Sequence, residues 1–203
     1  MTPGFNGQDL SETAELRKTF TIDKELCRLK VDIAALQETR LAESGSVKEN
    51  NYTFFWQGLA ESERRLYGVG FAVRNKLLNK ITTPKAKSER IISLQLTTKT
   101  GTAHVISAYA PTLDAECEKK DMFYEDLQTV PNEIPTSDQI ILLGDFNARV
   151  GADFDSWPTC IGKFGIGKMN ENGQRLLEFC TNNELSITNT FYDGKCCHKV
   201  SYH

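Results

Sequence analysis

The segment from residue 141 to residue 150, Ile-Leu-Leu-Gly-Asp-Phe-Asn-Ala-Arg-Val, constrains the fold of this chain most. An apolar run ends there abruptly in an acid and an amide two residues apart, as expected for a buried strand. Because side chains alternate across a strand, we expect Asp145 and Asn147 to face the same way and Phe146 to point back into the packing. A carboxylate beside an amide can hold a metal ion, a water molecule or a phosphate oxygen. A strand that ends in an ordinary Asx turn is the alternative that this segment alone leaves open.

Two earlier segments repeat the pattern of an apolar strand that ends in a polar group. Residues 31–40 run apolar until they reach Glu38, and this run indicates a strand covered on both faces. Residues 104–112 end with Tyr109, close to a proline that stops the hydrogen-bond ladder. Strand ends that carry a glutamate, a tyrosine and an acid–amide pair together predict a site for metal-assisted attack on a phosphate.

Three motifs in this order and at these separations resemble the endonuclease/exonuclease/phosphatase superfamily. They are Gln37-Glu38-Thr39-Arg40, Ala108-Tyr109-Ala110-Pro111 and Gly144-Asp145-Phe146-Asn147. The resemblance extends from about Leu10 to the C-terminus. More narrowly, residues 31–41 and 170–180 resemble craniofacial development protein 2-like proteins, which are themselves similar to the endonuclease domains of non-LTR retrotransposons.

The superfamily resemblance implies an α/β (α+β) fold, a four-layer sandwich of two packed mixed β-sheets flanked by helices. It also implies a single domain over residues 1–203 that is incomplete at both ends. The superfamily's first strand carries an asparagine that joins the metal site, whereas residues 1–6 contain no apolar strand. Its last strand carries an Asp-His pair, whereas no aspartate follows His203. We therefore expect missing strands at the termini and weak or absent nuclease activity for these 203 residues in isolation.

The resemblance also implies a role for each motif residue. Glu38 matches the glutamate that binds the catalytic divalent cation, Mg²⁺ or Mn²⁺. Asp145 matches the aspartate that orients or deprotonates the attacking water, and Asn147 the asparagine that helps to hold the scissile phosphate. Tyr109 matches a tyrosine near that phosphate. Arg149 lies two residues past the asparagine, and we expect it to meet a phosphate of the substrate.

Two classes of function follow from these residues. The first is Mg²⁺-dependent phosphodiester hydrolysis, foremost as a DNA endonuclease, with nucleic acid as the partner. The second is a catalytically degenerate binding protein derived from a retroelement endonuclease. A phosphomonoesterase of the same fold has less support, because the sequence shows no motif for inositol or other small head groups. Titration with a divalent metal separates the first two classes.

Composition and charge limit the remaining choices. A length of 203 residues with 39% hydrophobic and 25% charged residues suits one globular domain. The sequence contains neither an apolar run long enough to cross a membrane nor a signal peptide, so we expect an intracellular protein, in the nucleus if its substrate is DNA. A net charge of −3 argues mildly against a general nucleic-acid binder. Local basic clusters nevertheless occur at Lys76, Lys80, Lys85, Lys87 and Arg90, and at Arg149, Lys163, Lys168 and Arg175.

The six cysteines fit a reducing compartment. We expect Cys27, Cys117, Cys160 and Cys180 to act as small buried hydrophobic residues. The sequence Cys196-Cys197-His198 is a weak zinc motif, because no Cys-x-x-Cys pair accompanies it.

The hydrophobic pattern predicts an alternation of helices and strands. The expected helices cover about 9–30, 114–130 closed by Pro131, and a segment that Asn170 caps. The expected strands cover 31–38, 52–57, 68–74, 90–98, 102–110 and 186–191. Residues 151–169 are expected to form a long loop beside the site. Asn172 and Asn189 lie near the same elements, but capping and turn formation explain them as well, so we leave them out of the catalytic set.

Overall fold

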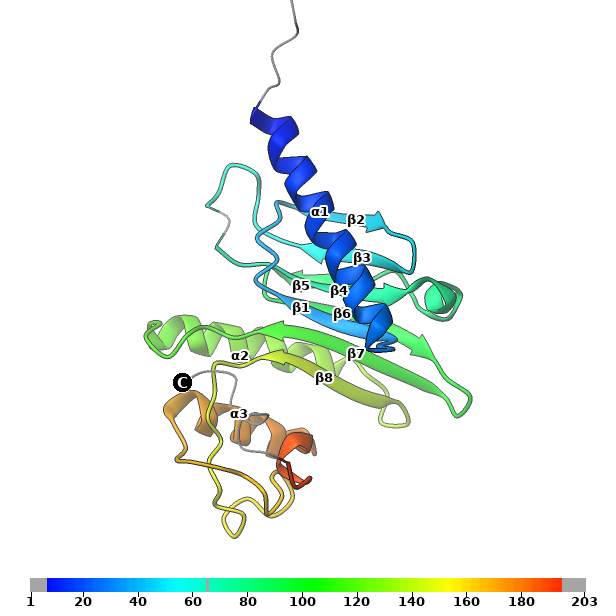
Figure 1. The fold of residues 1–203 in the computed structure, drawn as a ribbon. Coiled ribbons are helices and arrows are strands. Elements are labelled where there is room, and N and C mark those ends of the chain that lie inside the picture. Colours follow the sequence, from blue (N-terminus) through cyan, green and yellow to red (C-terminus); the bar gives the residue numbers. More distant parts are fainter. Residues whose placement is uncertain (1–6, 65, 195–203) are drawn as a thin grey trace, which may run out of the picture. The chain divides into compact units, whose positions relative to one another are not determined.

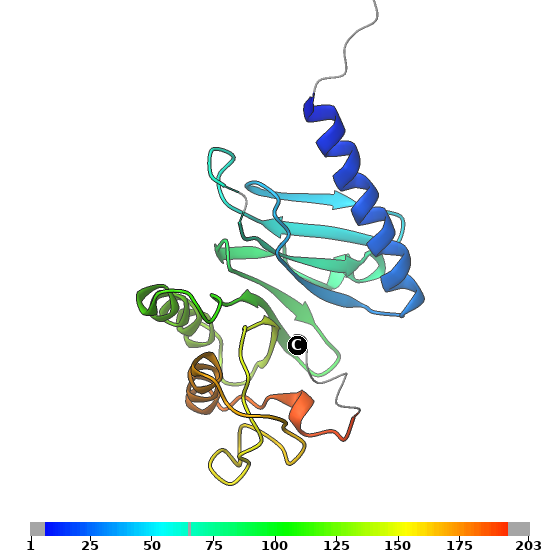
Figure 2. The same ribbon diagram turned by 60° about the vertical axis from the view of Figure 1, so that its left-hand side comes forward.

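The computed structural model describes residues 7–64 and 66–194, with side chains from Lys18 onward. These residues form two four-stranded sheets and three α-helices, and they divide into two compact units (Figures 1 and 2). We call the described residues up to Ser107, together with Ser137–Gly144, the sheet unit. The described residues of Ala108–Thr136 and from Asp145 onward form the helical unit. Each unit is described by itself.

The first sheet of the sheet unit is antiparallel, with the strand order β1-β4-β3-β2. Its strands are β1 (Ile33–Gln37), β2 (Ser44–Lys48), β3 (Tyr52–Gln57) and β4 (Val69–Arg74). Helix α1 (Gly7–Arg28) crosses this sheet (Figure 1) and packs on it through Leu26 and Cys27, which contact a buried cluster of Tyr52, Phe54 and Ala72. Leu26 and Cys27 are thus half-buried against this cluster, whereas Phe20 of the same helix and Leu29, the residue after its end, are exposed.

The second sheet has the strand order β5-β6-β7-β8, and its two central strands supply most of its buried residues. Its strands are β5 (Lys85–Ser88), β6 (Ile91–Thr97), β7 (Thr102–Tyr109) and β8 (Gln139–Asp145), and a short 3₁₀ helix, η1 (Asn75–Lys80), precedes β5. The two sheets pack against each other, with β4 against β6. The Gln37 side-chain amide donates to the Ser107 hydroxyl, from one sheet to the other, at 3.2 Å. The expected α+β architecture of two packed sheets with helices is confirmed.

The helical unit contains α2 (Cys117–Asn132), α3 (Glu171–Asn182) and the short 3₁₀ helix η2 (Thr188–Thr190). Apolar side chains of both α-helices are buried with residues of the intervening loop, namely Phe123, Leu127, Cys160, Ile161, Leu176, Leu177, Phe179 and Cys180. The loop at 151–169 is largely irregular, as expected, apart from an isolated bridge between Gly151 and Ile166.

One expected strand and one expected helix end are wrong. Residues 186–191 do not form a strand, because the backbone N–H and the hydroxyl of Thr190 both donate to the Ile187 carbonyl and close the 3₁₀ turn η2. Helix α2 does not end at Pro131 but includes it in its last turn and runs to Asn132.

The expectations that β1 is covered on both faces and that β8 is a buried strand are also wrong. Every residue of β1 is only half-buried, and Ile141 of β8 is 42% exposed. Each of these strands is the outermost in its sheet among the described residues, so one of its edges faces no neighbouring strand there.

The cysteines follow the expectation in part. Cys160 and Cys180 are buried and Cys27 is half-buried, but Cys117 is exposed because it begins α2 at the surface. Cys196, Cys197 and His198 lie outside the described residues. None of the described helices combines the length and apolarity that a membrane crossing needs.

Candidate active site at the strand ends

Strands β7 and β8 end side by side. The backbone N–H of Ala110, the first residue after β7, donates to the carbonyl of Asp145, the last residue of β8, at 2.9 Å. Tyr109, the last residue of β7, is buried. The sequence prediction that Tyr109 and Asp145 stand at strand ends is correct, and the hydrogen bond places those ends next to each other within the helical unit.

A left-handed turn, not strand alternation, sets the position of Asn147. Strand β8 already ends at Asp145, and Asn147 has a φ of +48°, a conformation that asparagine tolerates better than most residues. Its backbone N–H donates to Asp145 Oδ1 at 2.9 Å, and its Nδ2 donates to the Ala110 carbonyl at 2.9 Å. The Asx turn that the sequence left open as an alternative is thus present. The side-chain amide of Asn147 also joins the end of β8 to the end of β7.

Asn172 from the start of α3 joins the same cluster. Its Nδ2 donates to the carbonyls of Pro111 and Asn147, both at 3.1 Å, and the residue is 2% exposed. Among the described residues its buried Oδ1 has no hydrogen-bond partner. The catalytic set predicted from the sequence omits Asn172 because capping explains it as well, but the cap is Asn170, whose Oδ1 accepts from the Gly173 N–H at 2.8 Å. The signal that was available is that a helix needs only one capping asparagine, so a second one two residues later requires another explanation.

Arg149 is anchored to this cluster through its backbone. Its N–H donates to Asn170 Oδ1 at 3.0 Å, and its carbonyl accepts from the Asn170 N–H at 3.0 Å. The residue itself is exposed. Its main chain is therefore fixed while the guanidinium faces solvent, which suits contact with an anionic substrate.

Glu38 belongs to the sheet unit and follows β1 directly. Its φ is +51°, and its Oε2 lies 3.1 Å from the guanidinium of Arg40, whose φ is +54°. The Glu38 side chain is 42% exposed, so water or a cation reaches the carboxylate. Left-handed backbone at two non-glycine residues costs free energy and persists only where surrounding structure holds it. The Thr39 and Arg40 N–H groups donate to the carbonyls of Gly68 and Tyr67, both at 3.1 Å, and hold this segment.

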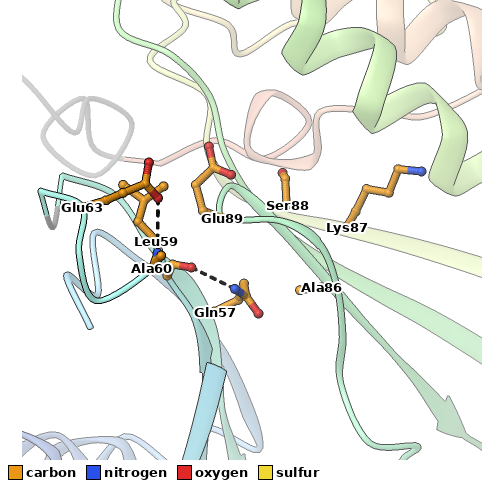
Figure 3. A pocket seen from close by; sticks show the side chains of 9 residues that line it. Gln57, Leu59, Ala60, Glu63, Ala86, Lys87, Ser88 and Glu89 are labelled. Atoms are coloured by element: carbon orange, nitrogen blue, oxygen red, sulfur yellow. Dashed lines mark hydrogen bonds between the residues drawn. The ribbon is translucent and has the colours of Figure 1, made fainter. Parts of the chain in front are cut away.

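A surface hollow lies in each of the two units. The hollow of the sheet unit measures about 360 Å³ and lies near the end of β3; Figure 3 shows Leu59 and Glu63 on one side of it and Ser88 and Glu89 on the other. It contains none of the expected site residues. The hollow of the helical unit measures about 420 Å³ and begins at Val150, directly after Arg149. Trp157, Lys168 and Met169 also line it, so the long loop borders the strand-end cluster as expected.

The donor atoms of the expected site residues suit a hard cation. Glu38 and Asp145 offer carboxylate oxygens and Asn147 an amide oxygen, the ligand types that Mg²⁺ and Mn²⁺ prefer. In the part of the chain that the structure describes, no group of three or more His, Cys, Asp and Glu side chains is arranged to hold a metal ion. A cation held by the Glu38 carboxylate would therefore keep several water ligands, as Mg²⁺ commonly does.

Comparison with known proteins decides the family. A model of the endonuclease/exonuclease/phosphatase family matches residues 7–193. The chain belongs to this family.

Further similarities agree with membership of the endonuclease/exonuclease/phosphatase family, whose members are generally hydrolytic enzymes and include nucleases and phosphatases. The chain is 34% identical over 175 residues to craniofacial development protein 2 of Bos taurus and 33% identical to that of Tragulus javanicus. Each match covers 86% of this chain but only 29% and 30% of the relative, so the chain spans less than a third of these proteins. The fold is similar to the endonuclease domain of TRAS1, a telomere-specific non-LTR retrotransposon, with a TM-score of 0.53 at 18% identity over 84% of this chain and 64% of that domain.

Proposed function

We propose that this chain carries the catalytic residues of an Mg²⁺-dependent phosphodiesterase that acts on nucleic acid, foremost as a DNA endonuclease. The observation that carries the proposal is the Asp145–Asn147 turn, which is fixed against the end of β7 by the Asn147 amide at 2.9 Å from the Ala110 carbonyl. We also propose that both compact units belong to one domain, because the family match runs across both of them.

The proposed chemistry begins with charge. A phosphodiester is anionic and repels an attacking hydroxide, so a site must neutralise charge and align a water molecule. Glu38 would hold the cation, since its carboxylate is exposed and follows a strand end. The cation would supply Lewis-acid polarisation of a phosphate oxygen.

In the proposed mechanism, Asp145 orients or deprotonates the attacking water. Its Oδ1 accepts from the Asn147 N–H, which fixes the carboxylate plane. Since Oδ1 accepts this hydrogen bond, Oδ2 is the oxygen that would accept a proton from water.

In the proposed mechanism, the phosphate is contacted by Asn147, Tyr109 and Arg149. One Nδ2 hydrogen of Asn147 is used on the Ala110 carbonyl, and the second is left to donate to a phosphate oxygen. Tyr109 is the last residue of β7 and directly precedes Ala110, which binds this amide, and the exposed guanidinium of Arg149 would bind a phosphate of the nucleic acid.

A non-catalytic nucleic-acid-binding protein is the second candidate. It is supported by the ion pair of Glu38 Oε2 with the Arg40 guanidinium at 3.1 Å, which already engages a carboxylate oxygen proposed for the cation. Such a protein would keep the fold and the basic residues but would not bind Mg²⁺ through Glu38.

Nicking of supercoiled DNA by stoichiometric protein in Mg²⁺ tests the proposal. We expect slow nicking that Asp145→Asn reduces by about 100-fold or more, because removal of the proton acceptor removes general-base catalysis. Asp153→Asn is the matched control, since it makes the same charge change in the following loop, where Asp153 accepts from the Ser156 N–H and hydroxyl. Nicking that survives in Asp145→Asn would refute the proposed role of this aspartate, and a wild-type protein that binds DNA without nicking it would favour the second candidate.

A further inference from the structure

We propose that Asn172 is a positioning residue that holds Asn147 and the β7 end in their working arrangement; this inference rests on the proposed function. Asn172 contacts neither substrate nor cation in this assignment. It acts through the two carbonyls that its Nδ2 binds, those of Pro111 and Asn147.

Both hydrogens of the Asn172 amide are used, one for each strand-end loop. Pro111 has no N–H, and Asn147 sits in a left-handed turn, so neither residue joins a regular ladder at this point. The side chain is 2% exposed, so water does not replace these hydrogen bonds without a rearrangement of the cluster.

The position of Asn172 is set by α3, not by the loops that it binds. Asn170 caps α3 and at the same time binds the Arg149 backbone in both directions. A Cβ atom on Gly173 would lie 1.8 Å from the Arg149 carbonyl, which shows how closely the helix start approaches the segment after Asn147. The α3 start therefore carries the Asn172 amide to the left-handed turn as a rigid support.

The same substitution at two asparagines distinguishes a positioning role of Asn172 from a general loss of stability at the start of α3. Asn172 uses its nitrogen and Asn170 uses its oxygen, so replacement by aspartate removes the donors of Asn172 but keeps the acceptor of Asn170. In Asn172→Asp a carboxylate faces two carbonyl oxygens, whereas Asn170→Asp leaves a good helix cap. Asn172→Ala removes the donors without adding a buried charge.

Hydrogen exchange of the Asn147 N–H is the readout that does not need activity. We expect exchange at this amide to accelerate about 10-fold or more in Asn172→Asp and Asn172→Ala, while the α3 core amides stay protected and Asn170→Asp resembles the wild type. In DNA hydrolysis we expect both Asn172 variants to lower kcat about 10- to 100-fold, the range for residues that support catalytic groups, with little change in KM.

Three results would overturn the assignment. The first is unchanged Asn147 exchange in folded Asn172 variants. The second is an equal effect of Asn170→Asp. The third is failure of both Asn172 variants to fold while Asn170→Asp folds, which would make Asn172 a structural residue. If the wild-type chain hydrolyses no DNA, the proposed function fails, whereas the exchange measurement still decides whether Asn172 fixes the turn.

Discussion

Lys120 and Lys119 are adjacent on α2 but differ in environment. Lys120 is 2% exposed, and its ammonium donates to the Leu113 carbonyl at 2.7 Å and to Glu171 at 3.2 Å. The Lys119 side chain is 65% exposed and forms an exposed ion pair with Glu116, the residue that precedes α2. Lys120→Met would remove both hydrogen bonds of this buried ammonium, so we expect the free energy of unfolding to fall by about 1–3 kcal/mol.

Lys119→Met is the matched control for this prediction. An exposed ion pair contributes little, so the change in free energy of unfolding should stay within about 0.5 kcal/mol. Urea denaturation of both variants gives the comparison. Equal losses would mean that the Lys120 hydrogen bonds contribute no more than a surface pair.

At the scale of single elements, helix propensity and close packing favour different residues at the start of α3. Replacing a helical glycine by alanine usually stabilises a helix by about 1 kcal/mol. At Gly173 the added Cβ would meet the Arg149 carbonyl at 1.8 Å. We therefore expect Gly173→Ala to lower the melting temperature, whereas Gln174→Ala, one residue further and exposed, should leave it nearly unchanged. A rise in melting temperature for Gly173→Ala would show that the close approach is absent in solution.

The contact between α2 and α3 should depend on pH. Lys120, and to a lesser degree Arg175, lowers the pKa of Glu171 from its ordinary 4.5. A depressed folded-state pKa stabilises the protein above the unfolded pKa, and this stabilisation is lost as the pH falls through the folded value. We expect Glu171→Gln to lower stability at pH 7 and to show a weaker further loss below about pH 4.5 than the wild type. Parallel wild-type and variant stability curves from pH 7 to pH 3 would contradict this assignment.

The strands that sequence reasoning found share a property that the missed strands lack. Strands β3, β6 and β7 are runs of apolar and β-branched residues, so the sequence alone predicts them. Strands β2 and β5 read Ser-Gly-Ser-Val-Lys and Lys-Ala-Lys-Ser and are outermost in their sheets as described, so pairing with a neighbour, not hydrophobicity, forms them.

In the candidate site, too, local sequence patterns predict some features and miss those that depend on distant contacts. Strand-end positions of Tyr109 and Asp145 follow from the apolar runs before them. The placement of Asn147 by a left-handed turn depends on hydrogen bonds to Asp145 and to Ala110, 37 residues earlier. The contacts of Asn172 likewise join α3 to loops 25 and 61 residues away, which no local pattern indicates.

At the scale of the whole molecule, family membership and catalytic role are separate questions. Residues 7–193 match the family model, yet the chain spans less than a third of its curated relatives. The fold supplies the strand-end turn, while the proposed role of the chain depends on whether Glu38 binds a divalent cation. Cation binding is therefore the property that distinguishes an enzyme from a binding protein of the same fold.

Calorimetric titration of the chain with Mn²⁺, alongside Glu38→Gln and Glu43→Gln, tests this central claim most directly. Glu43 is exposed on the segment that follows β1 and also has a left-handed backbone, so its variant makes the same charge change nearby. We predict that Glu38→Gln weakens Mn²⁺ binding by about 10-fold or more and that Glu43→Gln leaves it unchanged. Equal affinity in Glu38→Gln and wild type, or no Mn²⁺ binding by either, would contradict the account.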